Sequence, residues 1–189
     1  MRIIAGKYRS RRVNTISSGK GDCIKNNIIG FRPTTDRAKE TLFNVLNNVI
    51  DFDSINCLDL FAGSGSLGFE ALSRGAAGCD FVESSMKQVK SIEKTSFELG
   101  CKENISIYCE DVIKFLLESG EKYYDLVFAD PPYAYENYAD LSTEIFKLKF
   151  SIMVFEYGNS GSIFYNIKEY DIIDKKVGVT NFKIFISKD

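Results

Sequence analysis

The segment LVFADPPY at residues 126–133 begins like a buried strand and ends in residue types suited to precise hydrogen bonding. Four of its first five residues are apolar, and Asp130 is then followed by Pro131, Pro132 and Tyr133. The chain has only three prolines, and two of them stand here. Proline has no N–H donor and fixes φ, so the Pro131 carbonyl would be held beside the Asp130 carboxylate. The pattern predicts two rigid acceptors at a strand end; the simpler interpretation is a turn with a helix-capping acid.

The same four residues resemble motif IV, [DN]PP[YF], of enzymes that methylate an exocyclic amine. The lone pair of such an amine is delocalised into its ring, so the nitrogen must be drawn toward sp³ geometry before it attacks a methyl group. The Asp130 carboxylate and the Pro131 carbonyl could each accept one N–H of the amine, and Tyr133 could stack on a flipped base. We therefore predict that the catalytic residues are Asp130, Pro131, Pro132 and Tyr133.

A glycine-rich segment, DLFAGSGSLG at 59–68, forms the second candidate site. Gly63, Gly65 and Gly68 match the pattern GxGxxG between an apolar strand and a helical stretch. Glu83 ends the next predicted strand, where it could accept hydrogen bonds from both hydroxyls of a ribose. NAD, FAD and S-adenosylmethionine (SAM) sites all use this arrangement, and a turn that only permits close strand–helix packing is the structural alternative.

Asp59 helps to decide which of these cofactors the site binds, because it lies within the strand where a dinucleotide fold usually has an apolar residue. SAM carries a cationic sulfonium and an ammonium, which a carboxylate attracts, whereas a pyrophosphate would be repelled. DxFxGxG resembles motif I of amino-methyltransferases. The position of Asp59 therefore favours SAM.

Asp111 follows the third predicted strand of the repeating pattern. Ligands of parallel sheets lie beyond the carboxyl ends of the strands, so Asp111 could accept a hydrogen bond from an adenine amino group. It could also cap the helix predicted over 112–119. The two roles are compatible.

Basic residues are concentrated at the start of the chain. Residues 1–39 contain ten Lys and Arg but two Asp, although the whole chain has a net charge of −2. Such asymmetry is typical of a phosphate-binding arm on an acidic core, and a solvated basic hairpin is the alternative. The candidate RNA-binding residues are Lys7, Arg9, Arg11, Arg12, Arg32 and Arg37.

The segment RPTTDRAKETLFNVL at 32–46 contains two of these arginines around the start of a predicted helix. Free N–H groups at a helix start, flanked by Arg32 and Arg37, form a natural anion site. A well-capped core helix with solvated basic residues explains the same pattern equally well.

The elements that must position these residues follow from the apolar periodicity. Strands are predicted at 57–62, 79–84, 105–111, 124–130 and 151–157, with helices at about 36–50, up to 74, up to 99, at 112–119 and at 137–147. Residues 1–31 together predict a strand pair with a flexible connection, in which 16–31 resemble a loop, and the C-terminal tail predicts a hairpin. Strand–helix alternation predicts an α/β, doubly wound, mostly parallel sheet with one antiparallel addition. We divide the chain into an extension at 1–31 and a main domain at 32–189.

Composition excludes several kinds of chemistry. The chain has no histidine, so no Ser-His or Cys-His dyad can form, and its five cysteines are odd in number with no CxxC pair. We therefore expect neither a disulfide framework nor a metal site. With no long apolar run and no signal-peptide pattern, we expect no membrane contact and a cytoplasmic protein.

At this point the motifs together resemble one family, the 16S ribosomal RNA guanine-N2 methyltransferases of the RsmD type. The matching stretches are RIIAGKYRSRR, Arg32 to Leu46, Leu58 to Ala76 and Asp130 to Tyr133. The resemblance implies a seven-stranded, Rossmann-like SAM-dependent methyltransferase fold with a short N-terminal hairpin. It implies that the target guanine lies at Asp130 to Tyr133, in 16S rRNA of the small ribosomal subunit or its assembly intermediate. The SAM-binding residues that it implies are Asp59, Phe61, Ala62, Gly63, Ser64, Gly65, Glu83, Asp111, Val112 and Asp130.

Four other functions were weighed against this one. A DNA adenine-N6 methyltransferase shares DPPY but needs a target-recognition region, and the predicted sheet uses most of the residues after Tyr133. The basic arm argues against a protein glutamine methyltransferase. Asp59 and DPPY argue against a NAD-dependent oxidoreductase. An intact Asp130 argues against an RNA-binding module without catalysis.

Overall fold

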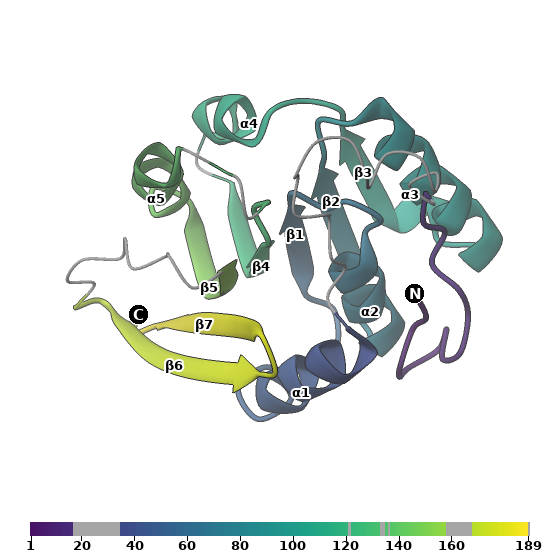
Figure 1. The fold of residues 1–189 in the computed structure, drawn as a ribbon, viewed down its shortest axis with the longest axis horizontal. Coiled ribbons are helices and arrows are strands. Elements are labelled where there is room, and N and C mark those ends of the chain that lie inside the picture. The colour runs from purple at the N-terminus through teal and green to yellow at the C-terminus, as the bar shows by residue number, and fades with distance from the viewer. Residues whose placement is uncertain (17–34, 121, 133–134, 136, 158–167, 189) are drawn as a thin grey trace.

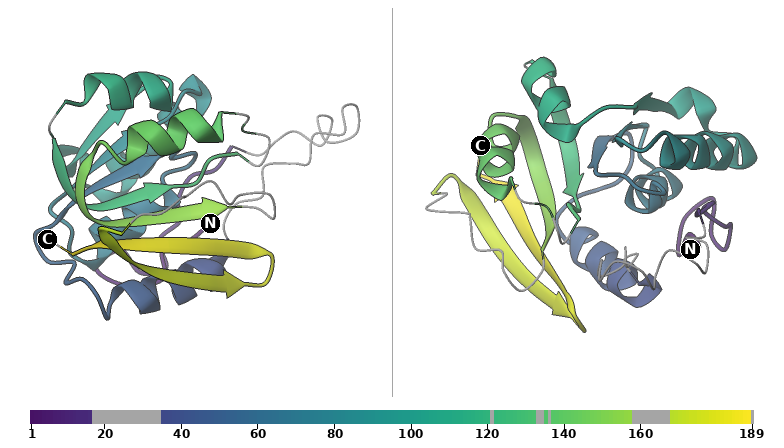
Figure 2. Two further views of the ribbon diagram at one scale, coloured as in Figure 1. Left: turned by 90° about the vertical axis from the view of Figure 1, so that its left-hand side faces the viewer. Right: turned by 45° about the horizontal axis from the view of Figure 1, so that its top comes forward.

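A computed structural model gives the fold, and it describes residues 1–16, 35–120, 122–132, 135, 137–157 and 168–188. A central sheet separates two helical layers (Figures 1 and 2). The strands are β1 (Asn56–Leu60), β2 (Gly78–Val82), β3 (Ile105–Tyr108), β4 (Tyr123–Ala129), β5 (Lys149–Tyr157), β6 (Tyr170–Val177) and β7 (Thr180–Ser187). The helices are α1 (Asp36–Leu46), α2 (Ser66–Arg74), α3 (Met86–Leu99), α4 (Val112–Glu118) and α5 (Tyr138–Ile145), with a short 3-10 turn at Lys102–Asn104.

The strand order is β3-β2-β1-β4-β5-β7-β6. The first five strands of this order are parallel, and β7 is antiparallel to both β5 and β6. The chain winds outward from β1 through β2 to β3 and then returns to place β4 on the other side of β1. The carboxyl ends of β1 and β4 therefore form the switch point where ligands of such sheets bind. The predicted seven-stranded, mostly parallel sheet is confirmed.

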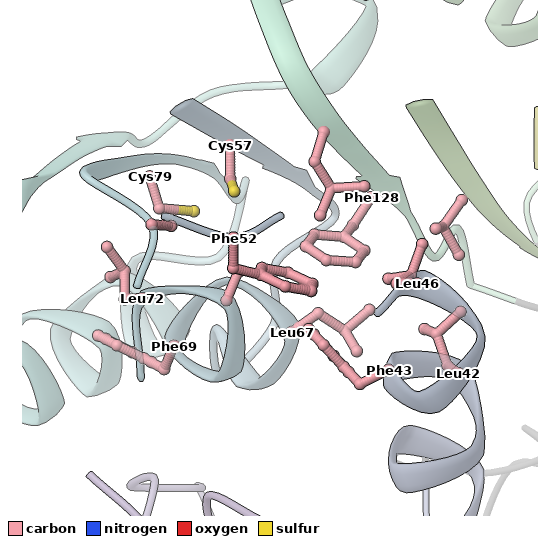
Figure 3. Packing of buried hydrophobic residues seen from close by; sticks show 14 of the residues in the cluster. Leu42, Phe43, Leu46, Phe52, Cys57, Leu67, Phe69, Leu72, Cys79 and Phe128 are labelled. Carbon is pink, nitrogen blue, oxygen red and sulfur yellow. The ribbon is translucent and has the colours of Figure 1, made fainter. Parts of the chain in front are cut away.

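Each face of the sheet has its own core. Helices α1, α2 and α3 cover the face that carries Cys57, Phe81, Phe128 and Val154. Helices α4 and α5 cover the face that carries Leu58, Val127 and Met153, among others. Figure 3 shows the first core, where Leu42, Phe43 and Leu46 of α1 approach Phe128 of β4. The rings of Phe43 and Phe128 are 5.8 Å apart between centroids. Side chains alternate between faces along each strand, so the face of every site residue can be assigned from the register.

Two predicted boundaries were wrong by three residues or more. The helix predicted over 36–50 ends at Leu46, because Asn47 caps it. The amides of Asn48 and Val49 then donate hydrogen bonds to carbonyls three residues earlier and form turns. The third strand ends at Tyr108 and not at 111, since the chain turns to begin α4. Residues 1–15 turn back on themselves through an antiparallel bridge between Arg2 and Arg12, and the rest of the strand pair predicted over 1–31 lies outside the described residues. The predicted division between 31 and 32 falls outside the described residues.

Candidate active site

The DPPY segment leaves β4 at the switch point. The Asp130 amide lies 3.5 Å from the carbonyl oxygen of Leu60, the last residue of β1. Pro131 is buried and Pro132 is exposed. The Pro132 carbonyl accepts a hydrogen bond from the Tyr135 amide at 2.8 Å, so this carbonyl closes the turn after β4. Tyr133, predicted to stack on the target base, lies outside the described residues.

The loop between β1 and α2 lies beside this segment. Its backbone is left-handed at three positions, with φ of 56° at Phe61, 55° at Gly63 and 76° at Gly65. A bulky residue such as Phe61 rarely adopts the left-handed region. Residues held in such conformations cluster at functional sites. The Ala62 amide donates to the Val82 carbonyl at 3.0 Å and ties the loop to the end of β2.

Glu83 holds the glycine loop in place, and its carboxylate keeps acceptor sites for a ligand. Its Oε2 accepts a hydrogen bond from the Gly63 amide at 2.8 Å, and its Oε1 accepts one from the Ser85 amide at 2.7 Å. A carboxylate has about four acceptor sites, so these two bonds leave capacity on each oxygen. Ribose binding by Glu83 stays a prediction, and the structure adds a role in holding the glycine loop.

Asp59 lies beneath the loop, on β1, with 2% of its surface exposed. Its Oδ2 accepts a hydrogen bond from the Gly68 amide at 2.9 Å, in the first turn of α2. Burial, opposed by this bond and reinforced by Glu83, raises the pKa of Asp59 to about 8. Gly68 must be a glycine because a Cβ there would lie 2.4 Å from a ring carbon of Phe81. The third glycine of the motif therefore permits close helix–strand packing.

Asp130 is the second acid of this site with a strongly altered proton affinity. Burial first, and then the charges of Glu156 and Asp59, raise its pKa well above the usual range. Glu156 lies at the end of β5 and is 4% exposed. The sequence prediction missed Glu156, although it is the one acid in the apolar run SIMVFEY.

Asp111 and Val112 begin α4 as predicted, at the end of the turn that follows β3. Asp111 Oδ1 accepts hydrogen bonds from the amides of Ile113 at 2.9 Å and Lys114 at 3.2 Å. The capping interpretation is confirmed, and adenine binding by Asp111 stays a prediction. Tyr135 is a second residue that the sequence prediction missed: its ring makes an edge contact with Phe61, with centroids 5.2 Å apart. Burial and then Asp111 raise the Tyr135 pKa, so the turn after β4 reaches the neighbourhood of Asp111.

The donor and acceptor set of the glycine loop fits SAM. The Ser64 hydroxyl is buried with no hydrogen-bond partner among the described residues, as expected for a group that waits for a polar ligand. It stands between two left-handed glycines and above the buried Asp59, which suits a ligand with both a carboxylate and a cationic centre. The residues that would hold SAM are therefore those of the loop, with Asp59 and Glu83.

The candidate RNA-binding residues lie on the surface. Lys7, Arg9, Arg11 and Arg12 are exposed, as is Arg37 on α1, while Arg32 lies outside the described residues. Arg9 and Arg37 share a cleft of about 430 Å³ with Arg2, which the sequence prediction left out. Arg2 pairs with Asp36 at 3.1 Å. The structure thus brings two predicted arginines, from distant segments, to one cleft.

A buried ionic cluster holds this basic segment on the main domain. Lys39 of α1 and Glu70 of α2 have no exposed side-chain surface and lie 3.5 Å apart between Nζ and Oε2. Glu70 accepts hydrogen bonds from the amides of Ile4 and Ala5, at 2.8 and 3.1 Å, and Lys39 donates to the Arg2 carbonyl at 2.7 Å. Burial, opposed by Glu70, lowers the Lys39 pKa.

The rest of this docking contact is equally close. Arg74 Nε donates to Glu70 Oε1 at 3.0 Å. Gly6 approaches α2 so closely that a Cβ there would lie 1.7 Å from the Ser73 carbonyl oxygen. The Thr35 hydroxyl accepts a hydrogen bond from the Ala38 amide, 3.2 Å away, at the start of α1. The described part of RPTTDRAKE therefore forms a capped core helix whose lysine anchors the N-terminal segment.

Over the described ranges, no helix is long and apolar enough to cross a membrane. No group of His, Cys, Asp and Glu in this part of the chain has the arrangement of a metal site.

The strand order, with a glycine loop after β1, an acid within β1 and acids after β2 and β4, is that of the SAM-dependent methyltransferase fold. A family described as "Conserved hypothetical protein 95", the RsmD family, matches residues 1–186. The chain belongs to this family, which confirms the resemblance inferred from the motifs.

Individual relatives agree with the family assignment. "Ribosomal RNA small subunit methyltransferase D" of Haemophilus influenzae is 40% identical over 135 residues, which are 70% of this chain and 64% of that protein. Its counterpart in Escherichia coli strain K12 is 39% identical over 133 residues, 70% of this chain and 60% of that protein. The chain thus spans less than two thirds of the length of these two relatives. A solved structure named "Putative methyltransferase yhhF from Escherichia coli" has a TM-score of 0.79 at 27% identity, over 99% of this chain and 97% of that one.

Proposed function

We propose that this chain transfers a methyl group from SAM to the exocyclic N2 amine of a guanine in 16S rRNA of the small ribosomal subunit. The observation that carries the proposal is the position of Asp130 and Pro131 beside the glycine loop, at the switch point of a methyltransferase fold. Two relatives named as small subunit rRNA methyltransferases support the substrate class. The basic N-terminal segment favours a nucleic-acid substrate, and the names of these relatives favour RNA over DNA.

The loop residues would bind the cofactor. SAM supplies a methyl group on a cationic sulfur, which makes that methyl electrophilic. The negative charge of Asp59 would balance this positive charge, and the bound cation would in turn favour the ionised form of Asp59. The remaining acceptor capacity of Glu83 would take the ribose hydroxyls, and Asp111 would take the adenine amino group. Phe61 and Val112 would contact the adenine ring.

The end of β4 would bind the target amine. The Asp130 carboxylate and the Pro131 carbonyl would each accept one N–H, which draws the nitrogen toward sp³ geometry. The nitrogen lone pair forms the new N–C bond while the C–S bond breaks and its electron pair goes to sulfur. The nitrogen then loses a proton, and the Asp130 carboxylate is positioned to take it. Tyr133 would stack on the guanine.

The basic segment would contact the RNA backbone. Lys7, Arg9, Arg11, Arg12 and Arg37 are exposed, and Arg32 belongs to the same prediction. Arginine and lysine supply the phosphate contacts that position a nucleic acid without reading its bases. The substrate would be 16S rRNA or an assembling subunit, in the cytoplasm.

The test is mass spectrometry of nucleosides after incubation of the protein with SAM and unmodified 16S rRNA. We expect N2-methylguanosine, and its absence with the Asp130→Ala variant. N6-methyladenosine would replace the guanine proposal with an adenine-N6 activity. No methylated nucleoside with rRNA or with assembling subunits would contradict the proposed activity.

A further inference from the structure

The outer face of α3 carries three lysines in one line, which we call the lysine stripe. Lys87, Lys90 and Lys94 are all exposed, and at about 100° per residue they fall within about 60° of the helix circumference. The stripe begins in the first turn of α3, shortly after Glu83, and covers about 10 Å of the helix axis. It therefore starts at the edge of the sheet that carries the glycine loop and leads away from that edge along the side of the molecule.

The docked N-terminal segment lies along the neighbouring strip of α3 (Figure 1). The Ser91 hydroxyl donates to the Asn14 carbonyl at 2.7 Å, and the Asn14 amide donates to Thr95 Oγ1 at 3.0 Å. At the carboxyl end of the helix, Arg11 Nη2 donates to the Glu98 carbonyl at 2.7 Å. Ser91 and Thr95 each follow a lysine of the stripe by one residue, so the segment and the stripe border one another on the helix surface.

Two acids share the outer face of α3 with the lysine stripe. Glu98 accepts a hydrogen bond from the docked segment at 2.9 Å, and Lys94 Nζ lies 3.9 Å from its other oxygen. Glu93 lies on the side of the exposed face that is turned away from that segment. Within the part of the chain that the structure describes, Lys87 and Lys90 have no ion-pair partner. These two lysines are therefore available to an anionic ligand.

Phe97 adds an aromatic ring to this basic face. Its side chain is 80% exposed, more than any other large apolar side chain in the described ranges. It lies one turn after Lys94 and beside Glu98, to which Arg11 binds, so cations stand on two sides of the ring. One exposed apolar side chain needs no explanation by itself. An exposed ring among cations, however, is the combination that binds single-stranded nucleic acid, because the cations hold the backbone while the ring stacks on a base.

We propose that the lysine stripe and Phe97 form a second RNA-contact surface, in which the three lysines bind backbone phosphates and Phe97 stacks on an unpaired base. The inference rests on the proposed function for the identity of its ligand, an rRNA. Stacking needs a base outside a duplex, so the ligand is a single-stranded stretch, loop or bulge near the methylated nucleotide. These contacts position the RNA without reading its sequence.

The direct test uses the absence of tryptophan from this chain. Phe97→Trp keeps a stacking ring and gives the protein one tryptophan. We expect unmodified 16S rRNA to bind this variant within about 3-fold of the original affinity and to quench most of its tryptophan emission. Leu117→Trp is the matched control, because Leu117 is 64% exposed on α4, which covers the other face of the sheet, and its emission should not change. Unchanged emission from Phe97→Trp while the rRNA binds would overturn the proposal.

The lysine stripe is tested by the salt dependence of binding. Replacing its three lysines with Gln should weaken binding of 16S rRNA by about 10-fold at moderate salt and lower the salt slope by about two to three. Phe97→Ala should weaken binding by about 10-fold without changing the slope, since stacking releases no counterions. Gln at both Lys175 and Lys176 of β6 is the control and should alter neither quantity. An unaltered slope in the triple variant would contradict the proposal.

Other readouts distinguish RNA contact from other roles of this face. Because the changed side chains are exposed, the urea midpoint of unfolding should stay the same in every variant. In methyl transfer, Phe97→Ala should raise the KM for rRNA by about 10-fold while the KM for SAM changes by less than about 2-fold. If Phe97→Ala instead abolishes self-association in sedimentation velocity and leaves RNA binding unchanged, the face is an interface between two copies and the proposal is wrong.

The tryptophan experiment also separates this inference from the proposed function. If no N2-methylguanosine is formed, the proposed function fails, whereas quenching of Phe97→Trp by rRNA still decides whether this face binds RNA. If the unmodified protein binds no rRNA, the second surface is refuted as well.

Discussion

Two clusters of buried charge sit on the same side of this sheet, and they are built in opposite ways. Around Glu70, one carboxylate meets Lys39, Arg74 and the amides of Ile4 and Ala5, so charge and hydrogen bonds are matched. Around Asp130, the charges of Glu156 and Asp59 act in the same direction as burial, and Asp59 and Asp130 both have raised pKa values. A cluster of matched charges fixes a structure. A cluster of like charges instead raises the pKa of its acids, so these acids can respond to a cationic ligand or accept a proton during a reaction.

The largest expected effect comes from Asp130→Ala. Methyl transfer should fall by about 10⁴-fold, equivalent to about 5 kcal/mol, because both the amine contact and the proton acceptor are lost. SAM affinity, measured by calorimetry, should stay within a few-fold of the original. A variant that no longer binds SAM would mean that Asp130 supports the cofactor site and not the target amine.

Glu70→Gln should have the opposite character. It leaves Lys39 and Arg74 without a compensating charge in a buried site, so the free energy of unfolding should fall by about 3 kcal/mol in urea titrations. Glu98→Gln is the control: Glu98 also contacts the N-terminal segment, through Asn14, but it is exposed and should cost less than about 1 kcal/mol. Equal effects of the two variants would show that the Glu70 cluster is not the anchor.

The pH dependence of stability also distinguishes the cluster around Asp130 from the cluster around Glu70. The pKa of Asp59 is about 8 in the folded chain against an ordinary value of 3.8, so the folded state keeps a proton that the unfolded state has released. The stability from this group is complete below about pH 4 and is lost as the pH rises toward 8. Between pH 5 and 8, unmodified protein should lose about 3.5 kcal/mol more than Asp59→Asn does, as measured by urea titrations. If the unfolding free energies of the unmodified protein and Asp59→Asn fall in parallel as the pH rises, the pKa of Asp59 is not raised.

The smallest expected effect concerns the surface of the docked segment. Reversing the charges of Arg9, Arg11 and Arg12 should weaken RNA binding by about 10-fold at moderate salt, and each lost phosphate contact should lower the salt slope by about one. Reversal of Lys175 and Lys176 on the distant strand β6 is the control. An unchanged salt slope in the triple variant would end the hypothesis of an RNA-binding arm.

The parts of the site that the sequence predicts are those made by neighbouring residues. The glycine loop, the turn at Pro131 and the cap at Asp111 depend on local backbone rules, and strand–helix alternation then brings their carboxyl ends to one edge. Glu156 was missed because its effect on the Asp130 pKa depends on the order of β4 and β5 in the sheet, and sheet order is not written in either strand. The docking of Ile4 and Ala5 on Glu70 joins residues more than 60 positions apart.

The errors have physical reasons of the same kind. Helix α1 stops at Leu46 because local turns at Asn47 and Asn48 end a periodicity that continues in the sequence. Within residues 1–16, the antiparallel pairing is limited to one bridge, because the amides of Ile4 and Ala5 bond to Glu70 and that of Tyr8 bonds to the Ser73 hydroxyl.

The anchoring of residues 2–8 on α2 also has a consequence for the order of folding. This segment is synthesised before its acceptors on Glu70 and Ser73, which follow it by more than 60 residues. It must therefore wait, unpaired in water, until α2 has formed, and only then can Gly6 close against Ser73. Its arginines and lysines keep it soluble during that delay, so the charge that we assign to RNA binding also protects the chain while it is being made.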